Sequence, residues 1–434
     1  MRVLRGPATP SIMRVDFCSL QQSPWSKDPR GEVPMRRRRL SSTSLIRSYN
    51  ATSILRTLHA KGACTRAELA RATGISPATV SRIVNQLAEA GLIQVKALAA
   101  SSGGRRPALL EIDQTKLHVV GVELRRDQVA MILVNLRGEA IRRAAYPPGT
   151  LQPEALVTHL AQRIHRLIEE AAVDRGSLLG VGLAVAGVVN RAEGRVVRSV
   201  NLGWAQVPLA AQLEERLELP VLVENDANAA ALSEVWFGQR HPPANLIFLK
   251  TEAGVGAGIV LEHQLFNGPR GMAGEIGHIP LIPDGHPCRC GQRGCLETYV
   301  NVRDVLKRYT ELTGREADQE TFFRRAAKGE PAARALVEEA RQALTLASAH
   351  VALLLDVEAI FIGGVWGAFS PAFVQEVEAG VQRVIDQTGL EKSVRVHGAS
   401  LGADADLMGA TGLVIDSWLT PHAPDRSELV RESW

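Results

Sequence analysis

Apolar residues near the start of the chain recur at the spacing of an amphipathic helix between Leu45 and Leu58. A short second helix is expected after Thr65, because its hydroxyl can cap the first turn while Glu68, three positions on, completes a capping box. Gly74 then allows a tight turn. The pattern predicts a long helix followed by a short helix that ends at a glycine.

A third helix is predicted to begin after Ser76, with Pro77 in the first helical position, where its missing amide hydrogen is harmless. Its buried face is expected to contain Val80, Ile83, Val84 and Leu87. Its exposed face is expected to contain Ala78, Thr79, Ser81, Arg82 and Asn85. Two helices joined by a glycine turn, the second with a small polar N-terminal face, allow a recognition helix to enter the major groove of DNA. The DNA contacts are assigned to Ser76, Pro77, Ala78, Thr79, Ser81 and Arg82.

Two short strands, 92–95 and 108–112, are expected to form a wing after the third helix. The loop between them ends in Gly-Gly-Arg-Arg-Pro, an extended and cationic segment, so Arg105 and Arg106 are candidates for the minor groove. These patterns predict a winged helix-turn-helix domain over residues 41–113. A three-helix core without DNA would give a similar pattern, so the prediction also rests on charge.

Beyond residue 116 the pattern alternates between strands and helices, which indicates an α/β domain with parallel pairing, and no short internal repeat is visible. The predicted strands are 119–123, 130–136, 179–184, 221–223, 246–250, 256–261 and 359–362. The predicted helices are 153–172, 227–236, 302–309, 331–355 and 371–385.

The charge is distributed unevenly along the chain. The whole sequence of 434 residues carries a net charge of +4, but residues 1–110 hold 18 Lys or Arg against 5 Asp or Glu, or +13, which leaves −9 for the remainder. This asymmetry favours a front end that faces nucleic acid, although a solvated basic tail would give the same count. Residues 1–40, which end in a run of four arginines, are expected to be a disordered tail, and 421–434 a second tail.

Composition also limits the compartment. No apolar run approaches the roughly 18 residues needed to cross a bilayer, and the first 40 residues lack the apolar stretch of a secretory signal, so a cytoplasmic protein without membrane contact is expected. The arginine-rich start also resembles an organelle transit peptide, but a bacterial regulator or an early start codon explains it more simply. Five cysteines, three of them close together, do not suggest a disulfide framework.

One short segment carries a metal-binding pattern. His278 is followed by Cys288, Cys290 and Cys295, with two glycines between the last two cysteines that allow a tight backbone. Three thiolates and one imidazole form a closed tetrahedral set, so one structural Zn²⁺ per chain is expected. A redox-active thiol pair is the competing interpretation, but it needs neither a third cysteine nor a histidine.

The stretch 273–278 (Ala-Gly-Glu-Ile-Gly-His), the cysteine cluster and the Cys-Leu-Glu segment at 295–297 closely resemble the signature of the ROK family, named for repressors, open reading frames and kinases. The resemblance runs from about residue 118 to about 418, and the winged helix-turn-helix in front of it is similar to the family's repressor branch. It implies an actin-like α/β fold of the hexokinase and ribonuclease H type, with two lobes around a cleft. The domain would span 116–420, with lobes of about 116–240 and 241–420.

The same resemblance implies the sugar contacts. In the family an Asn-Asp pair at the junction of a strand and a helix holds sugar hydroxyls, and the Asp is the general base of the kinases; Asn225 and Asp226 match this pair. Glu275, His278 and Glu297 match the remaining sugar-binding positions. His278 would keep one ring nitrogen on zinc and direct the other to a hydroxyl. Taken alone, such a segment is more often a helix cap than a sugar site, and the family resemblance is what favours the sugar.

The sequence departs from the family kinases at both phosphate loops. Residues 123–127 match a first-lobe Asp-x-Gly-Gly-Thr motif, but both glycines are replaced, by Arg125 and Arg126, and the threonine by an aspartate. Glu252 and Ala253 replace the first two residues of a second-lobe Gly-Thr-Gly loop. These side chains would occupy the phosphate cradle, so no enzyme activity is expected. Direct binding of phosphates by the two arginines remains an alternative.

The expected function is a sugar-responsive transcription regulator, a repressor of carbohydrate uptake or catabolism genes. It would bind a double-stranded DNA operator and a sugar or sugar derivative, as a homodimer or homotetramer. An ATP-dependent sugar kinase with an appended DNA-binding module is the first alternative. A sensor in which zinc itself is the signal is the second, although four ligands in a tight loop favour permanent occupancy.

Overall fold

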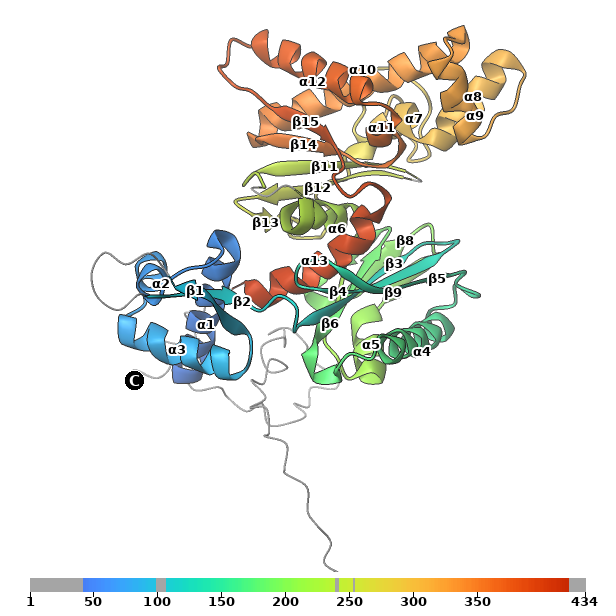
Figure 1. Cartoon of the computed structure of the whole chain (residues 1–434). Helices are drawn as coiled ribbons and strands as arrows, with labels where there is room; N and C mark the ends of the chain where they lie inside the picture. The colour runs from blue at the N-terminus through green and yellow to red at the C-terminus, as the bar shows by residue number, and fades with distance from the viewer. Residues whose placement is uncertain (1–41, 99–106, 239–241, 253, 421–434) are drawn as a thin grey trace, which may run out of the picture.

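The computed structural model describes residues 42–98, 107–238, 242–252 and 254–420. The expected N-terminal tail, the C-terminal tail, Ala253 and the wing loop that carries Arg105 and Arg106 lie outside the described residues. The described chain forms a small N-terminal domain beside an α/β domain of two lobes (Figure 1). None of its helices is long and apolar enough to span a bilayer.

The N-terminal domain has the predicted order of elements. Three helices precede a hairpin: α1 (Ser42–Lys61), α2 (Arg66–Thr73), α3 (Pro77–Glu89), β1 (Ile93–Leu98) and β2 (Ala108–Ile112). The two strands pair antiparallel, and Cys64 adds a bridge to Leu110 on their outer side. The three helices and the hairpin enclose one apolar core, so the wing is part of the fold and not an appendage.

The predicted helix ends are confirmed. The Thr65 hydroxyl accepts a hydrogen bond from the Glu68 amide at 3.3 Å, and the Glu68 carboxylate accepts one from the Thr65 amide at 2.7 Å, which is the predicted capping box. Gly74 ends α2 with a φ of 69°, a left-handed conformation that glycine adopts without strain. Ser76 caps α3 at Thr79, and the four predicted apolar residues of α3 are buried.

The first lobe is built on a five-stranded sheet in the order β10-β6-β3-β4-β5. Its strands are β3 (His118–Leu124), β4 (Val129–Asn135), β5 (Ala140–Tyr146), β6 (Leu178–Val185) and β10 (Val221–Asn225). Helices α4 (Pro153–Ala171) and α5 (Leu209–Leu217) share an apolar core with this sheet. A small antiparallel sheet of β7 (Val188–Asn190), β8 (Arg195–Ser199) and β9 (Trp204–Val207) extends this lobe, beside short turns at η2 (Arg175–Ser177) and η3 (Arg191–Glu193).

The second lobe repeats this architecture with the sheet order β13-β12-β11-β14-β15. Its strands are β11 (Leu246–Thr251), β12 (Val255–Leu261), β13 (Gln264–Leu265), β14 (Ala359–Ile362) and β15 (Arg395–Gly398). The helices in its core are α7 (Leu296–Val300), α8 (Val302–Thr313), α9 (Gln319–Ala327), α10 (Pro331–Leu355), α11 (Gly364–Phe369) and α12 (Pro371–Asp386). In both lobes the first three strands pair antiparallel and the next two join in parallel. The predicted actin-like α/β class is therefore confirmed.

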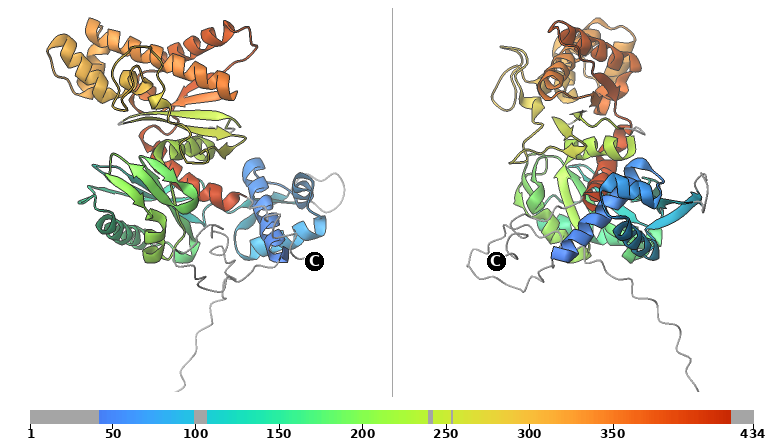
Figure 2. Two further views of the ribbon diagram at one scale, coloured as in Figure 1. Left: turned by 180° about the vertical axis from the view of Figure 1, so that it is seen from behind. Right: turned by 90° about the vertical axis from the view of Figure 1, so that its left-hand side faces the viewer.

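Two helices lie between the sheets. Each follows the last strand of one lobe in the sequence but packs against the sheet of the other lobe. Helix α6 (Asp226–Ser233) follows the last strand of the first lobe, yet packs on the second-lobe strands β11 and β12. Helix α13 (Ala405–Leu419) follows the last strand of the second lobe, yet packs on the first-lobe strands β3 and β6. The views from the front and from behind show the two helices stacked between the lobes (Figures 1 and 2). The chain therefore crosses between the lobes twice.

Glycines allow this four-layer stack. A Cβ added to Gly409 of α13 would lie 1.8 Å from the Ala229 carbonyl oxygen of α6. A Cβ on Gly182 of β6 would lie 1.8 Å from the Ala410 oxygen, and one on Gly258 of β12 would lie 2.3 Å from the Ala227 oxygen. Since real Cβ atoms do not approach this closely, each layer contacts the next through bare backbone.

The N-terminal domain is joined to this stack by a shared apolar core. Ile54 and Leu58 of α1 belong to the same cluster as Ile132 of β4 and Met408 and Ile415 of α13. The helix-turn-helix and the first lobe are therefore packed as one body at this face. A movement of α13 would therefore be transmitted to α1 through this shared core.

Replacing Gly409 with alanine should destabilise the protein by about 1–3 kcal/mol, because the new methyl group overpacks the α6–α13 contact and exceeds the small gain in helix propensity. The measurement is thermal unfolding followed by circular dichroism. Gly254→Ala is the control, since a Cβ there meets no atom within 4 Å. Equal melting temperatures for Gly409→Ala and wild type would contradict the close approach.

Candidate functional site

The expected Asn-Asp pair lies where β10 ends and α6 begins. The Asn225 side-chain oxygen accepts hydrogen bonds from the amides of Ala227 and Asn228 at 2.9 and 3.2 Å, while its amide group donates to the Gly187 carbonyl at 2.9 Å. Asn225 is therefore a helix cap held from both sides. This role fixes where α6 starts, and with it the position of Asp226.

A buried carboxylate supports the pair from behind. Glu224 is 1% exposed, and one of its oxygens accepts from the Asn225 amide at 2.8 Å and from the Asn228 side chain at 3.0 Å. Its other oxygen accepts from the Asn267 side chain at 2.7 Å. The sequence analysis did not identify Glu224 or Asn267 as site residues. Their pairing joins residues 43 positions apart, which residue spacing does not reveal. All three donors to Glu224 are neutral.

Asp226 is held by a buried lysine that the sequence did not reveal. The Lys250 ammonium group, at the end of β11, donates to Asp226 at 2.8 Å and to Asp406 of α13, and lies 3.9 Å from Glu252. Both Lys250 and Asp406 are at least nine-tenths buried. One cation thus joins β11, α6 and α13 at the centre of the stack, where a charge without a partner would be costly.

These buried charges shift one another's proton affinity. Burial raises the pKa of Asp406 to about 7, and the nearby Asp226 and Glu123 carboxylates act in the same direction, against Lys250. Burial also raises the pKa of Glu123, although Lys250 and Arg125 oppose it. Burial alone would lower the pKa of Lys250, but its carboxylate partners outweigh that effect and raise it. This cluster of buried charges therefore contains more carboxylates than cations to pair with them.

Glu275 connects the remaining predicted sugar residues. It precedes the turn η5 (Ile276–His278), and its side chain is open to solvent although protein surrounds it on most sides. Its pKa is raised by this loss of hydration and by the Asp226 and Glu297 carboxylates, and is lowered by His278. Asp226, His278 and Glu297 thus lie near enough to Glu275 to interact with it electrostatically, and Asn225 adjoins Asp226 in the sequence. The structure brings them together from α6, η5 and α7.

Glu297 is paired with a cation that was not predicted. Its carboxylate is 5% exposed and accepts from the Arg289 guanidinium at 2.6 Å. Its other oxygen lies 3.7 Å from Nδ1 of His278. Nδ1 is also the nitrogen that faces the cysteine cluster, which leaves Nε2 as the nitrogen available to a ligand.

The cysteine cluster has a geometry that could hold a metal ion. His278, Cys288 and Cys290 place their ligand atoms within 4.8 Å of one another. The sulfur of Cys295 lies 3.7 Å from that of Cys290, and Nδ1 of His278 lies 3.8 Å from the Cys288 sulfur. A tetrahedral ion with metal–sulfur bonds of about 2.3 Å separates two thiolates by about 3.8 Å. The spacing of His278, Cys288 and Cys290 is therefore compatible with a bound metal ion, and the Cys295 sulfur lies next to this cluster.

The predicted DNA-contact residues of α3 form its outer N-terminal face. Ser76, Pro77, Ala78 and Arg82 are exposed, while Thr79 and Ser81 are half-buried. The exposed Arg82 guanidinium has no hydrogen-bond or ion-pair partner among the described residues. Arg105 and Arg106 lie outside the described residues, so their assignment stays a prediction.

The segment matched to the first phosphate loop is the hairpin turn between β3 and β4. The Arg125 amide bonds the Gln128 carbonyl at 2.9 Å, and its guanidinium lies 3.7 Å from Glu123 and 3.5 Å from Asp127. The Arg126 guanidinium donates to the Asn201 carbonyl at 3.5 Å. The turn is therefore filled with paired side chains.

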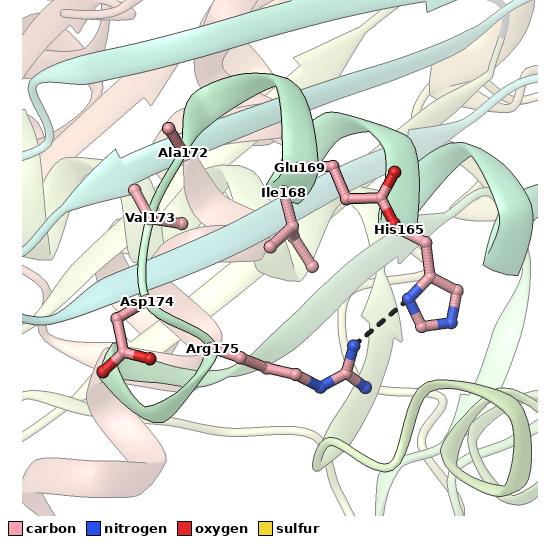
Figure 3. Close-up of a pocket in the computed structure, with 7 residues that line it drawn as sticks. All are labelled: His165, Ile168, Glu169, Ala172, Val173, Asp174 and Arg175. Atoms are coloured by element: carbon pink, nitrogen blue, oxygen red, sulfur yellow. Dashed lines mark hydrogen bonds between the residues drawn. The ribbon is translucent and has the colours of Figure 1, made fainter. Parts of the chain in front are cut away.

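A surface depression elsewhere on the first lobe contains none of these residues (Figure 3). It lies at the end of α4, where the Arg175 guanidinium points to Nδ1 of His165 at 3.2 Å and also donates to the Leu217 carbonyl. These contacts tie α4 to the end of α5. The depression is explained by helix packing and carries no argument for a ligand.

Comparison with known proteins identifies the domains. The model of the "ROK family" matches residues 119–417. The chain belongs to the ROK family. The model "Winged helix-turn-helix DNA-binding" matches residues 47–94 in front of the ROK domain.

The ROK relatives include regulators and kinases. The chain is 27% identical over 398 residues to the "Xylose repressor" of Caldicellulosiruptor bescii, which covers 88% of this chain and 99% of that protein. It is 32% identical to the "Glucokinase" of Halalkalibacterium halodurans, over 68% of this chain and 94% of that protein. Among solved structures, a "ROK family transcriptional regulator, homolog of E.coli MLC protein" matches with a TM-score of 0.73 and 25% identity, over 86% of this chain and 97% of that chain. The match to the kinase covers 68% of this chain, whereas the matches to these two regulators cover 88% and 86%.

Raising the pH from 5 to 8 should destabilise the wild-type protein relative to an Asp406→Asn variant. In the unfolded chain this carboxyl has its ordinary pKa of 3.8 and is ionised throughout, whereas in the folded protein its pKa is about 7. The folded state therefore binds an extra proton at pH 5, and that stabilisation is lost as the pH rises through 7. Melting temperatures of both proteins at each pH, in buffers of equal ionic strength, measure the effect. A difference that stays constant with pH would show that Asp406 is not perturbed.

Proposed function

We propose that this chain is a sugar-responsive transcriptional repressor, acting on genes for carbohydrate uptake or catabolism. It would bind operator DNA through α3 and the wing, and a sugar at the Asn225–Asp226 site. One observation carries the proposal: a single helical segment runs from this site to the DNA-binding domain. The names of the relatives, xylose and N-acetylglucosamine repressors, support it.

The helical segment consists of α6 and the π-helical turn η4 (Glu234–Gly238) that continues it. At its end the Trp236 ring contacts the His59 ring of α1 in a tilted arrangement, with a centroid distance of 4.7 Å and an interplanar angle of 49°, and the same ring packs over Gly412 of α13. From Asp226 to Trp236 the rise is about 15 Å at 1.5 Å per residue. A sugar that shifts the start of α6 would thus displace a ring that contacts the DNA-binding domain.

At the end of this segment, not every buried polar group has a hydrogen-bond partner among the described residues, as expected of an element that can adopt two positions. Nε1 of Trp236 and Oε2 of Glu234 are buried without a hydrogen-bond partner among the described residues. The other Glu234 oxygen accepts from the Ser400 amide at 2.7 Å, and burial raises the pKa of this carboxyl. π-Helical turns are rare and often mark functional sites. We assign this turn the role of transmitting sugar occupancy.

The Lys250 contact argues against phosphoryl transfer. A kinase needs its Asp226 carboxylate free to accept a proton from a hydroxyl, whereas here that carboxylate holds an ammonium group at 2.8 Å. Arg125 and Arg126 occupy the turn where bare glycine amides would hold ATP phosphates. We therefore propose that the chain binds a sugar without phosphorylating it. Its similarity to a glucokinase keeps an active kinase as the alternative.

We assign the metal as one structural Zn²⁺ held by His278, Cys288, Cys290 and Cys295. When bound, the ion would fix the loop that carries Glu275 and the start of α7, and so orient Glu297. The ion would have no open position for a reactive water. A closed set of this kind acts through stability rather than chemistry.

The decisive test of this proposal is DNA release by a sugar. A fragment from beside the chain's own gene should be bound by the purified protein, and one sugar of a panel that includes xylose and N-acetylglucosamine should change the affinity about 5- to 150-fold. Trp236→Ala should retain sugar binding but lose most of this effect, while Trp236→Phe, which keeps a ring against His59, should preserve it. Fluorescence anisotropy of labelled DNA, with calorimetry for the sugar, measures both.

Three outcomes would contradict this proposal. Loss of sugar binding in Trp236→Ala would place the ring in the fold of the site rather than in transmission. Failure to bind DNA at low salt, with and without the panel, would remove the repressor function. Steady ADP formation from ATP with one of the sugars would establish the kinase instead.

Purified protein should contain about one zinc per chain by elemental analysis, and Cys290→Ser should lower both the zinc content and the melting temperature. Cys64→Ser is the matched control, because Cys64 is buried in the N-terminal domain and its thiol donates to the Gly62 carbonyl. Its zinc content should remain near one. Full zinc in Cys290→Ser would show that the cluster is not the site.

A further inference from the structure

The charge and hydrogen-bonding character of the proposed sugar site indicate which class of sugar it accepts. Around Asn225 the described residues supply many carboxylates and few cations. The carboxylates at the site or in contact with its charged cluster are Glu123, Asp127, Asp226, Glu224, Glu252, Glu275, Glu297 and Asp406. The cations paired with them are Lys250, Arg125 and Arg289.

Each of these cations is already paired. Lys250 serves Asp226 and Asp406 and lies near Glu252, while Arg289 serves the buried Glu297. Arg125 lies between the two acidic residues of its own hairpin. None of the three is left to neutralise a further anion, so a phosphate bound by one of these cations would have to displace an existing ion pair.

The start of α6 does not offer the usual anion site of a helix. Amides at a helix N-terminus bind phosphate when they are free. Here the Ala227 amide is taken by the side chains of Asn225 and Asp226, and the Asn228 amide is taken by Asn225. The carboxylate of Asp226 would also repel an anion placed over these amides.

Two glycines of the second-lobe loop are also engaged. Gly256 and Gly258 lie in the β11–β12 ladder, opposite Lys250 and Phe248. Gly258 packs against the Ala227 carbonyl, as described above. These glycines serve sheet pairing and the contact with α6, so in this chain they do not form an open cradle.

Two buried side-chain amides next to the site have oxygen atoms that need a hydrogen-bond donor. Asn228 and Asn267 both donate to Glu224, and the side-chain oxygen of each is buried with no donor among the described residues. Asn228 is 2% exposed. Hydroxyl hydrogens can satisfy such oxygens, whereas a phosphate dianion offers only acceptors. The vacant hydrogen-bonding capacity therefore matches a polyol.

We infer that the effector is an uncharged sugar and that the site discriminates against the phosphate ester of the same sugar. This inference rests on the proposed function, since it concerns the ligand of the same site. Hydroxyl groups would donate to Asp226, Glu275 and the two unpaired amide oxygens. A phosphate group would meet a surplus of carboxylates whose few counter-ions are already in use.

The test compares matched pairs by isothermal titration calorimetry on the full chain: glucose with glucose 6-phosphate, N-acetylglucosamine with its 6-phosphate, and xylose with xylose 5-phosphate. For the pair that binds, the free sugar should bind at least tenfold more tightly and should be the member that changes DNA affinity. A phosphate ester that binds as tightly or more tightly, with DNA release intact, would overturn the inference and leave the proposed function standing. Absence of binding by every member would overturn both.

A charge variant tests the stated cause. Glu252→Gln removes one negative charge near Lys250 and nearly preserves the size and shape of the side chain, so it should narrow the ratio between the two dissociation constants of the binding pair several-fold. Glu262→Gln, beyond the opposite end of β12, makes the same change away from the cluster and should leave the ratio unchanged. An unchanged ratio in Glu252→Gln, or an equal change in both variants, would show that local charge is not what excludes the phosphate.

Discussion

The contact of α6 with α13 between the two sheets is the constraint on which the rest of this structure depends. At Gly409 the helices touch backbone to backbone, and Gly182 and Gly258 let each helix approach its sheet closely as well. Four layers thus fit into a space that side chains of ordinary size would widen. The thinness of the stack lets one lysine reach carboxylates on both helices.

Much of the fold could be predicted from the sequence because the signals were local. The caps at Thr65 and Ser76, and helices such as α10, follow from neighbouring residues and have the predicted limits or nearly so. Helix α13 was missed because Gly409 and Gly412, which its close packing requires, weaken the helical pattern. Strand β5 was missed because its side chains are largely exposed, so it lacks the alternation of a half-buried strand. The repeat of strand order in the two lobes leaves no trace in residue spacing.

The site residues likewise fall into two groups: some could be predicted from neighbouring residues, and others are brought together only by the fold. The cluster from His278 to Cys295 spans fewer than twenty positions, and its spacing alone indicated a metal. The pairing of Lys250 with Asp406 joins residues 156 positions apart, and only the return of α13 to the first lobe brings them together. Asn225 illustrates a different point, because its two interpretations, helix cap and sugar ligand, are compatible in the structure. A cap is a means of holding a ligand-binding carboxylate in place.

The π-helical turn at the end of α6 has a consequence for how such a protein can arise. Each of its hydrogen bonds spans one residue more than in an α-helix, so a single inserted residue is enough to create it. Removing that residue would rotate everything that follows by about 100°, and Trp236 would then face away from His59. Under the proposed function, communication between the sugar-binding domain and the DNA-binding domain would thus depend on the length of one helix, to the nearest residue. A lineage could gain or lose regulation by a one-codon insertion or deletion while both domains stayed folded.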